Sequence, residues 1–252
     1  MAVYRTLDIG TAKPSAAEQQ QIPHHAIDLV EPSEPFSVAA WLSEAGRAVD
    51  RIRARGRRVL FVGGTPLYLK ALREGLAAGP AADPALRESL AVRLEREGAA
   101  ALHRELATLD PGAAARIHPN DWRRTLRGIE VATVAPASHG REATWERGGT
   151  HASTAPMLIV DVPRKLLNER IAARVQKMFS AGLVEEVRAA EANGGIGATA
   201  GQAAGYSEVL AMLAGRSTLS DAIEQTIRRT RQLAKRQRTW LRSFGDAVWI
   251  CS

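Results

Sequence analysis

The chain has 252 residues, 45% of them hydrophobic, and a formal net charge of +7. Its apolar runs, such as those at 59–62 and 157–162, are far shorter than the roughly 20 residues needed to cross a bilayer, so no membrane span is expected. A single cysteine, Cys251, excludes an internal disulfide, and the histidines show no metal-ligand spacing. We therefore expect a cytoplasmic protein without a structural metal, whose basic charge favours a polyanionic partner.

The chain opens with MAVYRTLDIGTAKP, which resembles neither a secretory leader nor a strand. Asp8, Thr11 and Lys13 stand beside Gly10 and Pro14 in a polar, turn-forming segment. Loops of this kind often carry functional side chains on a scaffold. The three polar residues are therefore candidates for a substrate loop.

Apolar residues at helical spacing predict a helix over 36–55, which Gly56 ends. The run VLFV at 59–62 predicts a strand buried on both faces, and the next helix begins at Thr65-Pro66 after Gly63-Gly64. A strand, a glycine turn and a helix N-terminus together can bind an anion. The Thr65 hydroxyl would either cap its own helix, the favoured interpretation, or face a ligand.

Residues 80–118 are rich in Ala, Arg and Glu and predict a helical insertion without strands. A capped helix follows over 122–134, then a loop over 136–155 and a second buried strand over 157–162. The rest predicts helices at 164–181, 183–193, 203–214 and 220–243 and a last short strand at 248–250. Alternating strands and helices indicate an α/β protein with a parallel sheet, divided into 1–79 (first part of the core), 80–118 (helical insertion) and 119–252 (second part of the core).

The helix expected over 220–243 carries a basic stripe of five residues at spacings of three and four, inside a sector of roughly 80°: Arg228, Arg231, Lys235, Arg238 and Arg242. No acidic residue between 228 and 242 neutralises it, whereas an ordinary solvated helix mixes both signs. The stripe therefore favours nucleic-acid contact over a merely solvated face. Leu233 and Trp240 lie on another face and are expected in the core.

Two further arginine clusters have both a functional and an ordinary interpretation. Arg123, Arg124 and Arg127 lie on the first turns of a helix, where they either anchor phosphates or remain solvated. Arg170 and Arg174 flank an apolar stripe and either clamp a phosphate or decorate the surface. The phosphate-binding pattern G-x-x-x-x-G-K followed by Ser or Thr does not occur in the 252 residues.

A series of motifs spanning residues 3–242 resembles one family, the tRNA dimethylallyltransferases, also called tRNA isopentenyltransferases. The motifs occur in the family's order: YRTLDIGTAKP, FVGGTPLYLKALREGL, ADPALR, ARIHPNDWRRTLRGIEV, ERIAARVQKMFSAGLVEEV, QAAGYSE and TRQLAKRQRTWLR. The resemblance implies a P-loop kinase-like parallel sheet with an all-helical insertion. It also implies transfer of a dimethylallyl group from dimethylallyl diphosphate to N6 of the adenosine beside the tRNA anticodon, with magnesium, by a monomer.

The resemblance implies roles for single residues as well. Thr65 would hydrogen-bond the reacting end of the substrates, and Arg174 would hold the diphosphate. The tRNA anticodon stem-loop would be gripped by the insertion and by a larger set of residues: Arg87, Arg123, Arg124, Arg127, Gln202, Gly205, Tyr206, Arg231, Lys235, Arg236, Gln237, Arg238, Thr239, Trp240 and Arg242. Ser207 stands where a basic residue is frequent, and the loop over 136–155 follows the family pattern only loosely.

In the family, the stretch matching MAVYRTLDIGTAKP is preceded by a strand, a P-loop, a helix and a strand that ends in an aspartate proposed as the general base. We expect the magnesium ligands and this base in that preceding segment, whose strands these 252 residues lack. Besides the enzyme, two alternatives remain: a catalytically inactive, truncated tRNA-binding member of the family, and an unrelated small-molecule kinase of P-loop type. The basic stripe disfavours the kinase, because a small substrate has no obvious use for it.

Overall fold

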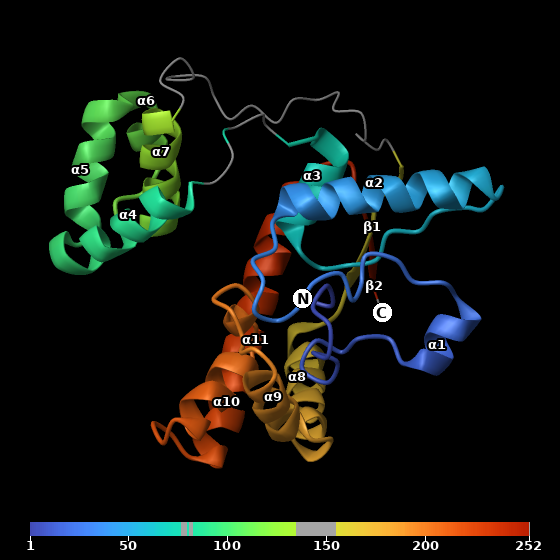
Figure 1. Ribbon diagram of the computed structural model, residues 1–252. Coiled ribbons are helices and arrows are strands. Elements are labelled where there is room, and N and C mark those ends of the chain that lie inside the picture. Colours follow the sequence, from blue (N-terminus) through green and yellow to red (C-terminus); the bar gives the residue numbers. More distant parts are fainter. Residues whose placement is uncertain (77–79, 81–82, 135–154, 252) are drawn as a thin grey trace. The chain divides into compact units, whose positions relative to one another are not determined.

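The computed structural model describes residues 1–76, 80, 83–134 and 155–251 and shows an α/β protein that is mostly helical (Figure 1). The chain divides into two compact units. The first unit combines Met1–Arg73 with His151–Ser252, and the second is Glu74–Thr150. Among the described residues, no helix has both the length and the apolar character needed to cross a bilayer.

The first unit holds a small parallel sheet of two strands, β1 (Leu158–Asp161) and β2 (Val248–Cys251). Leu158 lies opposite Val248, and Asp161 lies opposite Cys251. Parallel strands need a long crossover, and here a set of helices connects them (Figure 1). Both strands form where they were expected, but the expected burial of the first is wrong, because Leu158 and Val160 are each 63% exposed.

The helices of the first unit follow local signals. The helix α2 (Val38–Ala54) begins after Ser37, whose side chain accepts a hydrogen bond from the Ala40 N–H. Gly56, at φ +66°, follows the end of this helix. Thr218 and Asp221 form a capping box at the start of the longest helix. The helices are α1 (Ala16–Gln21), α2 (Val38–Ala54), α3 (Pro66–Glu74), α8 (Arg164–Ser180), α9 (Leu183–Ala192), α10 (Tyr206–Leu213), α11 (Leu219–Leu241) and the 3₁₀ turn η2 (Ala200–Gln202).

These bounds agree with the expected helices to within a few residues, apart from the short α1, which was not predicted.

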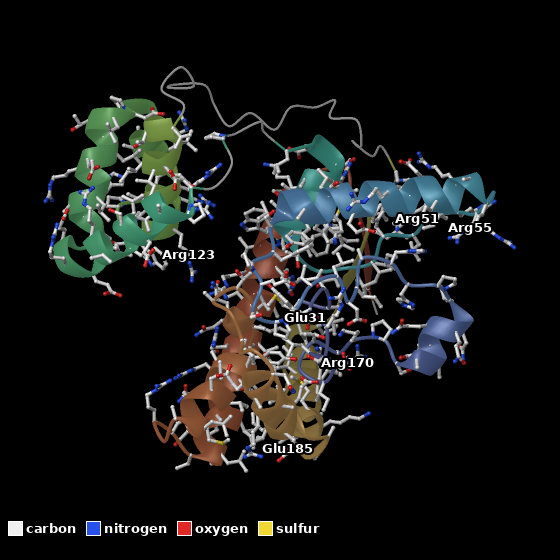
Figure 2. All side chains as sticks on the ribbon, viewed as in Figure 1. Glu31, Arg51, Arg55, Arg123, Arg170 and Glu185 are labelled. Carbon is white, nitrogen blue, oxygen red and sulfur yellow. The ribbon has the colours of Figure 1, made fainter. Side chains whose placement is uncertain are left out.

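At the C-terminal end of α2, Arg51 and Arg55 place positive charge where the helix dipole favours it (Figure 2).

The strand expected at 59–62 is wrong. Residues 57–65 contain no strand in the described part of the chain, and Leu60 and Val62 are 85% and 87% exposed. A buried strand requires hydrogen-bonded neighbours on its edges, and the β1–β2 sheet does not extend to this segment. An apolar run records hydrophobicity but not whether a neighbouring strand is present.

The core of the first unit forms where the N-terminal loop packs against α8, α9 and α10. Tyr4 and Leu7 from the loop are almost fully buried there, together with Leu183 and Val187 of α9. Tyr4 also forms an isolated parallel bridge with Val30. The loop therefore belongs to the core that supports the site described below.

The second unit is a helical bundle of α4 (Pro84–Glu97), α5 (Ala99–Leu109), α6 (Pro111–Arg116) and α7 (Trp122–Val134). Leu102, Leu106 and Ile129 form its core, and a Cβ at Gly128 would lie 2.9 Å from the Leu106 side chain. The glycine thus permits the close approach of α5 and α7. The assignment of 122–134 to the second part of the core is therefore wrong, because the apolar face of α7 is buried by α5.

Candidate active site

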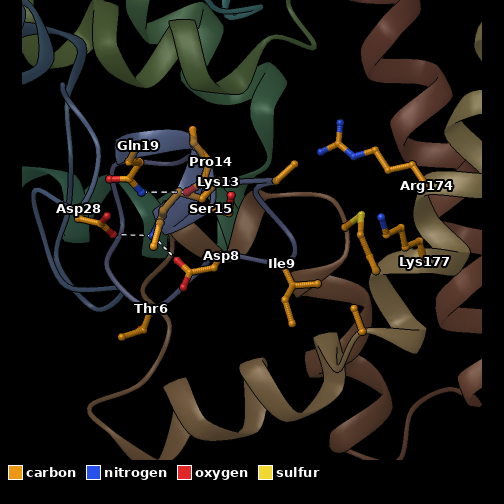
Figure 3. A pocket seen from close by; sticks show the side chains of 14 residues that line it. Thr6, Asp8, Ile9, Lys13, Pro14, Ser15, Gln19, Asp28, Arg174 and Lys177 are labelled. Carbon is orange, nitrogen blue, oxygen red and sulfur yellow. Dashed lines mark hydrogen bonds and ion pairs between the residues drawn. The ribbon is translucent and has the colours of Figure 1, made fainter. Parts of the chain in front are cut away.

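A pocket of about 820 Å³ opens in the first unit between the N-terminal loop and α8 (Figure 3). The loop contributes Asp8, Ile9 and Lys13 to its wall, and α8 contributes Arg174 and Lys177. Two of the candidate substrate-loop residues, Asp8 and Lys13, thus meet the candidate diphosphate ligand, Arg174, at one cavity.

Lys13 is the structural centre of the loop. Its side chain is only 4% exposed, and its Nζ donates to the Tyr4 carbonyl at 2.9 Å and to carboxylate oxygens of Asp8 and Asp28, each at 2.5 Å. A buried ammonium needs such partners to offset its lost hydration. The positive charge of Lys13 is therefore balanced within the loop. The Thr11 side chain also makes a hydrogen bond within the loop, because its hydroxyl donates to the Leu7 carbonyl at 2.6 Å.

Arg174 and Lys177 form the cationic wall of the pocket. They lie one turn apart on α8, both are exposed, and neither is paired with an acidic residue in the described part of the chain (Figure 3). Arg170, a further turn back, is exposed on the same helix (Figure 2). Unpaired cations on a cavity wall can bind a phosphate or diphosphate.

The Gly63-Gly64-Thr65 turn does not line this pocket. Its Gly64 carbonyl accepts a hydrogen bond from Gln237 Nε2 of α11 at 2.6 Å, and the Thr65 carbonyl accepts from the N–H groups of Tyr68 and Leu69 in α3. Among the described residues the Thr65 hydroxyl has no hydrogen-bond partner. The favoured interpretation of this hydroxyl as a helix cap is therefore wrong, and it remains free for a ligand.

The basic stripe of α11 is mostly exposed, but one member is neutralised. Arg231, Lys235 and Arg242 face solvent, whereas Arg238 is partly buried and donates from Nη2 to Asp161 of β1 at 2.7 Å. The absence of an acidic partner, expected from α11 alone, is thus wrong at Arg238. The partner comes from a strand far away in the sequence.

The opposite side of α11 also differs from expectation. Leu233 and Trp240 are 42% and 37% exposed, so their assignment to the core is wrong. Seven residues separate them, which places them on one face of α11, the face that is buried nearer the start of the helix at Ala222 and Thr226. Arg236 and Thr239, from the implied tRNA set, are exposed as well.

Gly205 and Tyr206, from the same set, lie inside the protein. Gly205 has φ +103° and donates its N–H to the buried Glu208 at 2.8 Å, while Tyr206 is 0% exposed. Burial, together with the hydrogen bond to Glu186, raises the pKa of Tyr206, so its hydroxyl stays protonated and donates to that carboxylate at 2.7 Å. The core therefore encloses Tyr206, in contrast to the surface position that tRNA contact implies. Gln202 is exposed.

In the second unit, Arg87 and Arg127 converge on Glu130, a residue that the sequence analysis missed. Glu130 is 1% exposed and accepts two hydrogen bonds from Arg87 at 3.0 Å and one from Arg127 at 2.6 Å. Both arginines keep about half of their surface exposed. Arg123 stacks over Trp122 at 4.8 Å, and Arg124 lies 3.4 Å from Asp121.

The carboxylates of the described residues offer no preformed metal cluster. No group of three or more His, Cys, Asp or Glu side chains is placed to hold a metal in that part of the chain. Asp8 and Asp28, the two carboxylates beside the pocket, are both committed to Lys13.

Fold and site together define an α/β protein built around a cationic pocket. The sequence model of a family described as IPP transferase matches residues 2–244. A tRNA dimethylallyltransferase of Bordetella petrii is 46% identical over 255 residues, which cover 98% of this chain and 81% of that relative. The chain belongs to the IPP transferase family.

Solved structures agree. The tRNA isopentenylpyrophosphate transferase of Bacillus halodurans is similar at a TM-score of 0.68 and 37% identity, over 99% of this chain and 78% of that one. A eukaryotic dimethylallyltransferase acting on tRNA is similar at a TM-score of 0.74 and 25% identity, over all of this chain and 65% of that one. The similarity thus extends across nearly the full length of this chain.

Proposed function

We propose that this chain transfers a dimethylallyl group from dimethylallyl diphosphate to N6 of the adenosine adjacent to the anticodon of tRNA. The observation that carries the proposal is the family match over residues 2–244, together with relatives such as the 46% identical one of Bordetella petrii, which is named tRNA dimethylallyltransferase. The similarity to transferase structures also supports a P-loop kinase-like core with a helical insertion as the finer description of the fold.

In the proposed reaction, a bond forms between N6 of adenine and C1 of the dimethylallyl group while the C1–O bond breaks. The electron pair leaves with the diphosphate, and N6 loses a proton to a base. Arg174 and Lys177 offer two unpaired positive charges at the pocket wall, where they would stabilise the departing diphosphate. The free hydroxyl of Thr65 supports its role as a hydrogen-bond partner of the reacting groups.

The tRNA would bind along α11. Arg231, Lys235 and Arg242 are exposed on one face, and such phosphate contacts position a nucleic acid without reading its sequence. The helical insertion would contact the anticodon stem through exposed side chains such as Arg123. The target adenine would leave its stack to enter the protein, as base-modifying enzymes require.

The test is transfer of labelled dimethylallyl to an anticodon stem-loop, followed by identification of the modified nucleoside. We expect Arg174→Ala to lower the rate by about 10² to 10³-fold, because it removes a charge that stabilises the leaving group. Arg164→Ala, which removes an exposed arginine at the start of the same helix, should leave the rate unchanged. Stem-loop binding without any transfer would instead favour the catalytically inactive, tRNA-binding alternative.

A further inference from the structure

Three consecutive backbone N–H groups of the N-terminal loop point at one carboxylate of α9. Glu186 Oε2 accepts from the N–H groups of Asp8 and Ile9, each at 2.7 Å, and Oε1 accepts from that of Gly10 at 3.2 Å. Successive N–H groups that converge in this way form an anion-binding nest. Here the anion is supplied by the chain itself, from a residue more than 170 positions away.

The loop has a backbone that needs such an anchor. Thr6 and Ala12, which flank the nest, both adopt left-handed conformations, with φ of 60° and 50°. Residues with a side chain rarely adopt this region, and they stay there only when the surrounding structure holds them. Three charge-assisted hydrogen bonds between these two positions supply that restraint.

Tyr206 holds the Glu186 carboxylate from the side of the protein core. Its hydroxyl donates to Glu186 Oε1 at 2.7 Å, and a Cβ at Gly10 would lie 2.5 Å from its ring. Because Gly10 has no side chain, the loop can pack directly against the Tyr206 ring and bring its N–H groups to Glu186. The buried position of Tyr206 is thus explained by support of the loop.

The same loop segment forms the pocket wall that faces α8. Asp8 takes part twice, since its N–H binds Glu186 while its carboxylate binds Lys13 Nζ. Loss of the hydrogen bonds to Glu186 would let Asp8 move. Its carboxylate would then no longer be held against Lys13, and the charge of the pocket wall opposite Arg174 and Lys177 would change. The geometry of the pocket therefore depends on a carboxylate that does not line it.

We propose that Glu186 is a positioning residue, an internal carboxylate that occupies the backbone nest of residues 8–10 and so sets the pocket wall opposite Arg174 and Lys177. The step from pocket wall to ligand rests on the proposed function, in which this pocket holds the diphosphate. The anchoring itself depends only on the contacts of Glu186.

The first measurement is amide hydrogen exchange of the full chain. Glu186→Gln keeps the volume but replaces one acceptor oxygen by a donor, so the amides of residues 8–10 should exchange about tenfold faster or more. Glu185→Gln is the matched control, because Glu185 is the neighbouring glutamate of α9, and its side chain is 69% exposed and pairs with Arg188 at 3.8 Å (Figure 2). Equal exchange in Glu186→Gln and wild type would overturn the proposal.

The second measurement is rescue. Glu186→Ala leaves the nest empty, and acetate added at constant ionic strength should restore amide protection at residues 8–10, whereas chloride should not. A merely structural role of Glu186, in packing alone, would show no such response to a small carboxylate. Protection that acetate fails to restore counts against the proposal.

The third measurement links the anchor to the pocket through calorimetric binding of inorganic pyrophosphate. We expect Glu186→Gln to weaken binding about tenfold and Glu185→Gln to leave it unchanged. Unchanged binding in Glu186→Gln would contradict the effect on the pocket. Absence of binding in wild type would instead contradict the proposed function, while the exchange data would still decide whether Glu186 anchors the loop.

Discussion

Glu130 shows how a single buried carboxylate organises the second unit. Burial raises the pKa of this carboxyl, but hydrogen bonds from Arg87, Arg127 and the Asp83 N–H outweigh burial and hold the pKa below its usual range. Asp83 also caps α4, accepting from the Leu86 N–H at 3.1 Å. One carboxylate therefore joins the start of α4 to α7 and orients two arginines that the family resemblance places at the tRNA.

This arrangement predicts a pH dependence. A carboxyl whose pKa is lower in the folded state stabilises the fold above its unfolded pKa, about 4.3, and that contribution is lost as the pH falls through the folded value. Glu130→Gln should therefore cost about 1–3 kcal/mol at neutral pH and should lose less stability on acidification than wild type. Amide exchange in α7 between pH 3 and 7 measures both effects. Parallel pH profiles for variant and wild type would contradict the assignment.

The helix α11 combines two tasks along its length. Its exposed cations, Arg231, Lys235 and Arg242, face solvent, while Gln237 and Arg238 bind the Gly64 carbonyl and Asp161. The second pair ties α11 to the turn that carries Thr65 and to the end of β1. Part of α11 is thus exposed, and another part joins the helix to the rest of the first unit.

The two parts should respond differently to substitution. Replacing Arg231, Lys235 or Arg242 by Ala should weaken binding of cognate and non-cognate stem-loops about equally, and each should reduce the slope of log K against log salt by roughly 0.7 to 0.9. Thr65→Ala, which removes no charge, should leave that slope unchanged. Filter binding across a salt series measures it. A triple variant with unaltered affinity and slope would show that α11 is only a solvated face.

Beyond its helices, the protein presents an apolar sheet face to solvent. Leu158 and Val160 of β1 are each 63% exposed, and Val248 and Ile250 of β2 are 58% and 43% exposed, whereas Ile159 between them is buried. Alternation along both strands thus places four apolar side chains on one side of the sheet. Contiguous apolar surface of this kind promotes association.

We therefore expect self-association that rises with protein concentration. Val160→Thr combined with Val248→Thr should reduce it, because the two substitutions place hydroxyls on the exposed face while keeping β-branched side chains. Val92→Thr, a substitution of an isolated exposed valine on α4, should have no effect. Sedimentation velocity over a range of concentrations distinguishes them. Association that is insensitive to the double variant would locate the contact elsewhere.

The helices were predictable because their signals are local. The apolar spacing over 36–55, Gly56 after it and the Gly-Gly turn with Thr65-Pro66 before α3 are all read from neighbouring residues. The placement of Arg174 beside the core stripe of α8 follows from helical spacing in the same way. The family resemblance, which the comparisons confirm, rests on the order of such local motifs along the chain.

Burial and pairing were not predictable, because they depend on residues distant in sequence. The amino-acid pattern placed Leu233 and Trp240 inside and left Arg238 unpaired, but the packing of the first unit exposes the two apolar residues and brings Asp161 to the arginine. Periodicity identifies the faces of a helix without identifying what lies against each face. The contact of Glu186 with the backbone of residues 8–10 has no sequence signal at all, because every residue except proline carries the same main-chain N–H group and only the tertiary fold directs three of them at one carboxylate.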